Sequence, residues 1–185
     1  LHRLHELSSR LLDTRTLSEQ LHMILVALAD FHGARRGVLT LFDTASGTLG
    51  IDSSTGFTPD AIARLMQTSG IDGACAICCA QRERTVIEDI AGADVDPGLR
   101  ALAGEEGFRA VHATPLDGQD GEALGAISIH LDRPRMPTAR ERTLADICAR
   151  KAATFIERAR AQAAYQESQG RFQAVLDAAA VPFVV

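Results

Sequence analysis

Apolar residues recur every three or four positions near both ends of the chain, and this spacing predicts amphipathic helices. Leucines at this spacing predict a first helix over residues 1–15. A second helix begins at the capping box Thr16-Leu-Ser-Glu19 and ends at Gly33. A third begins at Thr138, in a capping box with Glu141, and its pattern continues past residue 164.

Between these helices the pattern alternates over short stretches, which predicts strands. Residues 38–42 and 48–51 predict a first hairpin, residues 85–90 a single strand, and residues 107–134 a second hairpin around a turn rich in Gly and Asp. Short helices are expected from Thr58-Pro59, over residues 73–82, and from Asp96-Pro97 to about Gly104.

Alternation within the second hairpin predicts two faces of different chemistry. One face is expected to carry Val111, Ala113, Ile127, Ile129 and Leu131. The other is expected to carry His112, Thr114, Ser128 and His130. The apolar face would pack on a core, and the polar face would meet solvent or a ligand.

This order of elements predicts an α+β fold, an antiparallel sheet with helices on both faces and long N- and C-terminal helices. The terminal helices would cover the apolar face, and the short middle helices would roof the polar one. The last helix is long enough to overhang its domain, and Cys148, Ala152, Phe155 and Ala159 form a small-residue seam for a partner helix. We expect a helix over residues 1–15, the sheet domain over 16–160, a helical linker over 161–171 and a further domain starting at 172–185.

The composition narrows the function. A net charge of -5 gives no support for nucleic-acid binding. No apolar run approaches the ~20 residues of a membrane span, and no signal segment opens the chain. Three of the four cysteines lie within five positions, a poor disulfide framework, so we expect a cytoplasmic protein without membrane contact.

Five segments, in this order, resemble a GAF domain over about residues 17–160: GARRGVLTLFD, TGF, ERTVIEDI, GFRAVHATPL and LGAISIH. The tail FQAVLDAAAVPFVV resembles the start of a PAS domain. The resemblance implies a small-molecule or redox sensor of a bacterial signalling protein, such as a sensor histidine kinase or a cyclic-di-nucleotide enzyme. It also implies a pocket between the sheet and the middle helices, and a homodimer formed through the terminal helices.

Several GAF subtypes fit poorly. The chain has no Asn, which the cyclic-nucleotide-binding signature requires, and no Cys-His pair of the kind that attaches a bilin chromophore. It also lacks a kinase phosphoacceptor motif and a Gly-rich nucleotide loop, so the output would lie elsewhere. The sequence specifies neither a cofactor nor the identity of a ligand.

The cysteine cluster has three interpretations. Cys75 and Cys79 share a helical face and Cys78 lies beside it. They could be small apolar fillers, a redox sensor facing the pocket, or ligands of a metal completed by a histidine.

His112, Thr114, Ser128 and His130 could present donors and acceptors to a polar ligand or sense pH, or the histidines could bond the loops above the sheet. Phe57, Met66 and Phe108 are candidate pocket walls or core residues. Arg133 and Arg135 follow the hairpin and are expected on a solvated edge.

A ligand-binding or redox-sensing module that signals through its terminal helices fits these features best. One alternative is a GAF-fold thiol enzyme such as a free methionine sulfoxide reductase, although that family spaces its reactive cysteines more widely. The other is a dimerisation module without a ligand.

Overall fold

The computed structural model describes residues 16–44, 46–68 and 73–179. Its elements are α2 (Leu17–His32), β1 (Arg36–Asp43), β2 (Thr48–Thr55), α3 (Pro59–Thr68), α4 (Ala74–Gln81), β3 (Thr85–Ile87), α5 (Pro97–Glu106), β4 (Ala110–Asp117), β5 (Ala123–Leu131) and α6 (Ala139–Ala179). The five strands form one antiparallel sheet in the order β2-β1-β5-β4-β3. The expected α+β class and order of elements are confirmed. The expected helix over residues 1–15 lies outside the described residues.

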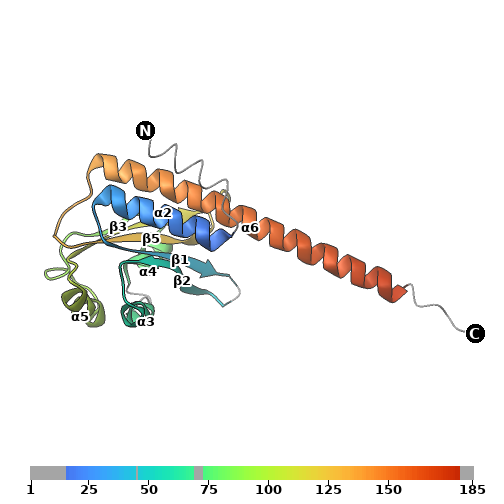
Figure 1. Cartoon of the computed structure of the whole chain (residues 1–185), viewed down its shortest axis with the longest axis horizontal. Helices are drawn as coiled ribbons and strands as arrows, with labels where there is room; N and C mark the ends of the chain where they lie inside the picture. The colour runs from blue at the N-terminus through green and yellow to red at the C-terminus, as the bar shows by residue number, and fades with distance from the viewer. Residues whose placement is uncertain (1–15, 45, 69–72, 180–185) are drawn as a thin grey trace, which may run out of the picture.

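The sheet and the helices on its two faces form three layers. Helices α2 and α6 lie side by side on one face of the sheet, and the shorter helices α3, α4 and α5 cover the other (Figure 1). Each face has its own core. The core beneath α2 and α6 includes Leu21, Leu25, Leu39, Ile127 and Ile156. The core beneath the short helices includes Val38, Leu99, Phe108 and Val111.

Local signals set the ends of several elements. The Thr16 hydroxyl accepts from the Glu19 amide and completes a capping box, and Gly33 ends α2 in a left-handed conformation. Asp96 caps α5 with Pro97 at its first turn. The strand expected over residues 85–90 is shorter, because the Asp89 carboxylate accepts from the Ala91 amide and turns the chain after Ile87.

Helix α6 runs without a break through Gly170 to Ala179, about 60 Å at 1.5 Å per residue. Residues 172–179 are part of this helix. Two of the four residues of the predicted seam, Cys148 and Ala152, are buried in the core shared with α2, whereas Phe155 and Ala159 are only half-buried. Residues 161–174 are exposed and extend beyond the sheet (Figure 1). The residues beyond 179, where the PAS resemblance ends, lie outside the described part.

The register of the second hairpin corrects the two predicted faces. His112 lies opposite Ile129, Val111 opposite His130, and Ala113 opposite Ser128. Residues that lie opposite each other on neighbouring strands point to the same face. His112 and Thr114 therefore face α2 and α6, whereas Ser128 and His130 face α3, α4 and α5. Our expectation that all four share a face is wrong.

The cause is a bulge near the hairpin turn. Asp117 pairs with Ala123, but Leu116 already pairs with Gly125, so Leu124 has no partner in the register. If the pairing at Asp117 continued without a break, His112 would lie opposite Ser128. One extra residue in one strand reverses which side chains share a face.

Candidate ligand cavity between the sheet and the short helices

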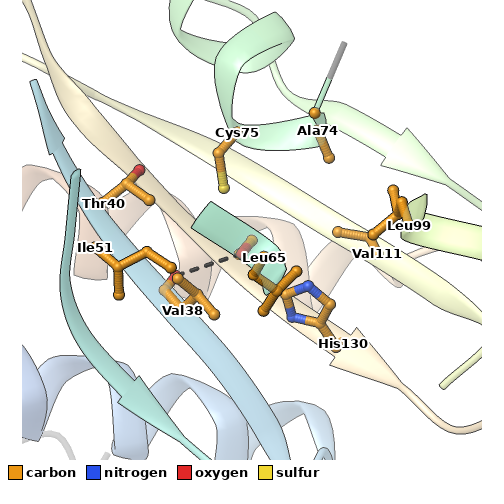
Figure 2. Close-up of a pocket in the computed structure, with 11 residues that line it drawn as sticks. Val38, Thr40, Ile51, Leu65, Ala74, Cys75, Leu99, Val111 and His130 are labelled. Atoms are coloured by element: carbon orange, nitrogen blue, oxygen red, sulfur yellow. Dashed lines mark hydrogen bonds between the residues drawn. The ribbon is translucent and has the colours of Figure 1, made fainter. Parts of the chain in front are cut away.

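A small cavity, partly open to solvent, lies between the sheet and the short helices, with a volume of about 30 Å³ (Figure 2). Its floor comes from β1, β2, β4 and β5, and its roof from α3, α5 and the start of α4. The lining residues are Val38, Thr40, Ile51, Leu65, Gly73, Ala74, Cys75, Leu99, Val111, Ser128 and His130. Because one water needs at least about 10–15 Å³, this space holds very few waters.

His130 is the most polar group of this cavity and is 4% exposed. Its ring lies edge to face between Phe57 and Phe108, with centroid distances of 5.0 and 4.9 Å. Its Nδ1 atom is buried and has no hydrogen-bond partner among the described residues. Burial, together with positive charge from Arg36 and His112, lowers the pKa of His130 to about 3. The imidazole is therefore neutral at pH 7.

Hydroxyl groups line the opposite part of the cavity. Thr40 donates to the carbonyl of Ala126 at 3.2 Å, and Ser128 donates to the carbonyl of Val38 at 3.4 Å. Cys75 points from α4 toward the sheet (Figure 2). Burial raises the pKa of the Cys75 thiol, although the nearby hydroxyls of Ser128 and Thr40 act to lower it. The cavity therefore presents neutral hydroxyl, thiol and imidazole groups on an apolar wall.

The other cysteines of the cluster lie elsewhere. Cys78 is fully buried in the core under α4, and Cys79 is half-buried and lines a separate hollow together with Met66. Burial raises the pKa of both thiols to about 12, so they remain protonated at neutral pH. Within the described ranges, no three His, Cys, Asp or Glu side chains are grouped to hold a metal ion.

The structure thus brings together only part of the predicted site. Cys75, Ser128 and His130 line the cavity, and Phe57 and Phe108 enclose His130. Met66 is 55% exposed, and His112 and Thr114 lie across the sheet. Thr40 also lines the cavity but was not predicted, although a single polar residue within the apolar run of β1 could have indicated a site residue.

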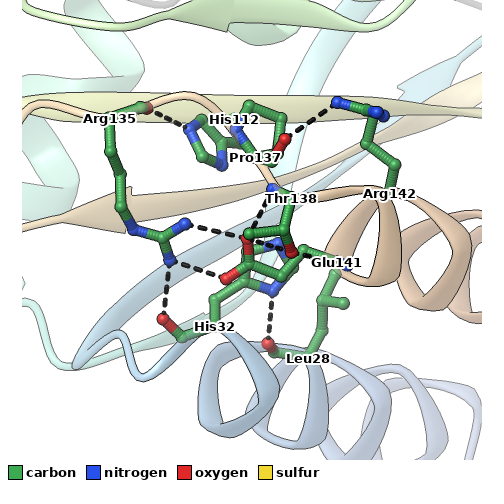
Figure 3. A network of polar contacts seen from close by, with 8 residues as sticks. All are labelled: Leu28, His32, His112, Arg135, Pro137, Thr138, Glu141 and Arg142. Atoms are coloured by element: carbon green, nitrogen blue, oxygen red, sulfur yellow. Dashed lines mark hydrogen bonds and ion pairs between the residues drawn. The ribbon is translucent and has the colours of Figure 1, made fainter.

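His112 belongs instead to a polar network where the terminal helices meet the sheet (Figure 3). The Arg135 guanidinium donates to Glu141 Oε1 at 2.7 Å and Oε2 at 2.8 Å, and to the His32 carbonyl at 2.9 Å. His112 Nε2 donates to the Arg135 carbonyl at 2.9 Å. Glu141 also accepts from the amide and hydroxyl of Thr138 in the expected capping box. We call this set of residues the helix clasp.

The clasp corrects the expectation that Arg135 lies on a solvated edge. Its paired carboxylate, Glu141, has a side chain only 12% exposed. The Arg135 hydrogen bonds lower the pKa of Glu141 to about 2. Arg135 thereby joins the last turn of α2 to the first turn of α6.

We expect Arg135→Ala to lower the free energy of unfolding by about 2 kcal/mol. The substitution removes a bidentate ion pair, and it takes from Glu141 and the His32 carbonyl the hydrogen bonds that Arg135 donates. Arg133→Ala is the matched control, because Arg133 is exposed and should change stability by no more than about 0.5 kcal/mol. Urea denaturation of both variants measures the difference. Equal losses would contradict the role of the clasp.

Comparisons with known proteins agree with this architecture. The sequence profile of the GAF domain family matches residues 16–156. The chain therefore belongs to the GAF family. None of the curated proteins compared with it matches.

Solved structures share the fold at low sequence identity. A domain assigned to a two-component sensor histidine kinase of Sinorhizobium meliloti 1021 is 23% identical, with a TM-score of 0.70 over 83% of this chain and 99% of that one. The GAF domain of a phosphoenolpyruvate-protein phosphotransferase from Coxiella burnetii is 20% identical, with a TM-score of 0.74 over 87% and 94%. GAF3 of Slr1393 from Synechocystis sp. PCC6803, in its photoproduct state, is 14% identical, with a TM-score of 0.64 over 82% and 99%.

Proposed function

We propose that this GAF domain is a sensory module of a bacterial signal-transduction protein, which binds a small molecule in the cavity beside His130 and signals through α6. The unpaired, buried Nδ1 of His130 carries this proposal. A buried polar atom without a partner destabilises the folded state by about 1–3 kcal/mol, and a ligand that forms a hydrogen bond with this atom would remove that penalty.

The size of the cavity suggests how binding becomes a signal. Ligand pockets commonly measure about 300–1,000 Å³, far more than the volume of the cavity beside His130. A ligand larger than a few waters therefore requires the roof of α3, α4 and α5 to move outward. Binding would favour an open arrangement over the closed one, and only this difference in affinity can drive signalling.

We also propose, by analogy, what kind of protein contains this domain. The Sinorhizobium relative comes from a sensor histidine kinase, which supports an output domain of this kind beyond residue 185. We further propose a cytoplasmic location and a homodimer formed through the terminal helices. Among the described residues, no helix is both long and apolar enough to cross a membrane.

Thiol chemistry is a weaker candidate for this site. Burial raises the pKa of Cys75, Cys78 and Cys79, whereas a redox sensor or a reductase needs a reactive thiolate. We therefore propose ligand binding rather than cysteine oxidation as the signal.

The test measures the thermal stability of the chain in the presence of a library of small, mostly uncharged molecules that carry hydrogen-bond donors or acceptors. A true ligand at 100 times its dissociation constant should raise the free energy of unfolding by ~2.7 kcal/mol. His130→Phe should weaken its binding by about tenfold or more, the loss expected for one hydrogen bond. His112→Phe, the same substitution on the opposite face of the sheet, should leave the affinity for this ligand unchanged. A library without a hit, or a hit unaffected by His130→Phe, would overturn the proposal.

Signalling needs a separate measurement. A spin label at Gln162, on the exposed part of α6, reports the distance between helices in a dimer. The ligand found above should shift this distance in the parent protein. Tight binding without a shift would remove the signalling half of the proposal.

A further inference from the structure

A second hollow, which we call the hairpin groove, opens between the free end of the β1–β2 hairpin, the end of α3 and one side of α4. Its volume is about 670 Å³, within the range of known ligand pockets and far above the 30 Å³ of the cavity beside His130. Phe42 and Leu49 line it from the hairpin, Met66 from α3, and Cys79 and Ala80 from α4. None of its lining residues lines the cavity beside His130.

None of the described residues that line the groove has a charged side chain. Its polar side chains are the Thr48 hydroxyl, the Gln67 amide and the Cys79 thiol. Burial raises the pKa of Cys79 to about 12, so this thiol carries no charge at neutral pH. An ionised ligand would lose hydration here without gaining a counter-charge from the described lining residues, whereas an apolar one would release water from Phe42, Leu49 and the 55%-exposed Met66.

The wall of the groove is tied directly to α6. Arg160 donates to the carbonyl of Phe42 at 2.7 Å and pairs with Glu122 at 3.1 Å. Phe42 lines the groove, and so does Ala123, the neighbour of Glu122. Immediately after Arg160 the helix becomes exposed, and it leaves the sheet at the same end as the β1–β2 hairpin (Figure 1).

We propose that the hairpin groove binds an uncharged, largely apolar small molecule, and that Arg160 couples its occupancy to the segment of α6 that leaves the domain. An occupant contacts Phe42 and Ala123, the two positions that Arg160 holds through the carbonyl of Phe42 and through Glu122. This site is distinct from the cavity beside His130, and it can exist whether or not that cavity takes a ligand.

The first test uses the uncharged naphthalene dye prodan, with the anionic dye anilinonaphthalene sulfonate as a probe of charge selectivity. Prodan should bind the whole chain saturably, and the anionic dye should bind about tenfold more weakly or worse. Ala80→Phe fills the groove from an exposed position of α4 and should weaken prodan about tenfold. Gln81→Phe places the same ring one residue further along α4, outside the groove lining, and should leave prodan binding unchanged.

Thr48→Lys is an independent variant that adds a positive charge to the groove from the exposed start of β2. It should also weaken prodan about tenfold, so the proposal stays testable if Ala80→Phe misfolds. Prodan binding that survives either folded variant, or equal affinity for the two dyes, would overturn the site. His130→Phe should leave prodan binding intact, which separates failure of the groove from failure of the cavity.

The coupling is tested by amide hydrogen exchange over residues 157–165. Prodan should change the exchange rate of this segment by about threefold or more in the parent protein. Arg160→Gln should still bind prodan yet lose this change, because it no longer holds Phe42 and Glu122 together. An unchanged rate in the parent, or a response that persists in Arg160→Gln, would show that Arg160 does not couple the groove to α6.

Discussion

Lowering the pH from 7 to 5 should reduce the free energy of unfolding by about 2 kcal/mol through His130 alone, and by about 4 kcal/mol at pH 3.5. The folded pKa of about 3 lies below the ordinary value of 6.5. Between these two values the unfolded chain binds a proton that the folded one excludes. The contribution of His130 to the free energy of unfolding is thus fully present above pH 6.5 and is lost as the pH falls toward 3.

His32 and His112 act in the same direction. Burial lowers the pKa of each, and their rings lie 6.0 Å apart beneath the terminal helices. Each is therefore neutral in the fold at a pH where the unfolded chain takes up a proton. The total decrease in the free energy of unfolding on acidification should therefore exceed the part due to His130.

The variant His130→Phe measures how much of this decrease is due to His130. The variant removes the titrating ring and the unpaired Nδ1, and its larger ring can extend into the cavity, so it should be more stable than the parent by about 1–3 kcal/mol at pH 7. It should also lose about 2 kcal/mol less between pH 7 and 5. Urea denaturation at each pH measures both effects. His22→Gln, at an exposed position, controls for loss of a histidine as such. A parent-like pH profile for His130→Phe would contradict the buried, neutral imidazole.

Gly125→Ala should destabilise the fold by about 3 kcal/mol or more, the range of severe core substitutions. A Cβ at this position would lie 2.0 Å from the Thr40 carbonyl oxygen and 2.9 Å from its carbon. The backbone φ of Gly125 is 154°, a value that other residues rarely adopt. Because the clash involves the backbone of the neighbouring strand, it can be relieved only by moving β1 from β5 or by breaking the bulge.

Gly104→Ala is the matched control. No atom lies within 4 Å of a Cβ built at Gly104, which lies on α5. There the same substitution should stabilise the protein by about 0.4–1 kcal/mol, because alanine reduces the freedom of the unfolded chain. Thermal unfolding should therefore move in opposite directions for the two variants. A parent-like stability of Gly125→Ala would refute the tight approach of β5 to β1.

Local chemistry made much of the fold predictable. The capping boxes at Thr16 and Thr138 and the Asp96-Pro97 start each depend on residues within one turn, and all three form as expected. The alternation within each strand was also correct. The length of the third strand was not, because the Asp89 turn ends it sooner than its apolar pattern suggested.

The candidate site was predicted less completely. Cys75 and His130 do line one cavity, but Thr40 joins them from β1, a strand for which the sequence suggested no site residue. Arg135 and Arg133 look alike in the sequence, yet only Arg135 meets a carboxylate and a helix end, through contacts that span up to 103 residues. Such partners are decided by how distant elements pack.

The amino-acid sequence by itself determined the helices, the hairpins and the alternation along each strand, since these depend on neighbours a few residues apart. Only the tertiary structure decided that Ser128 and His130 share the ligand side while His112 and Thr114 face the terminal helices. The physical reason is the single unpaired residue at Leu124, tolerated beside Gly125, which reverses the pairing of β4 with β5.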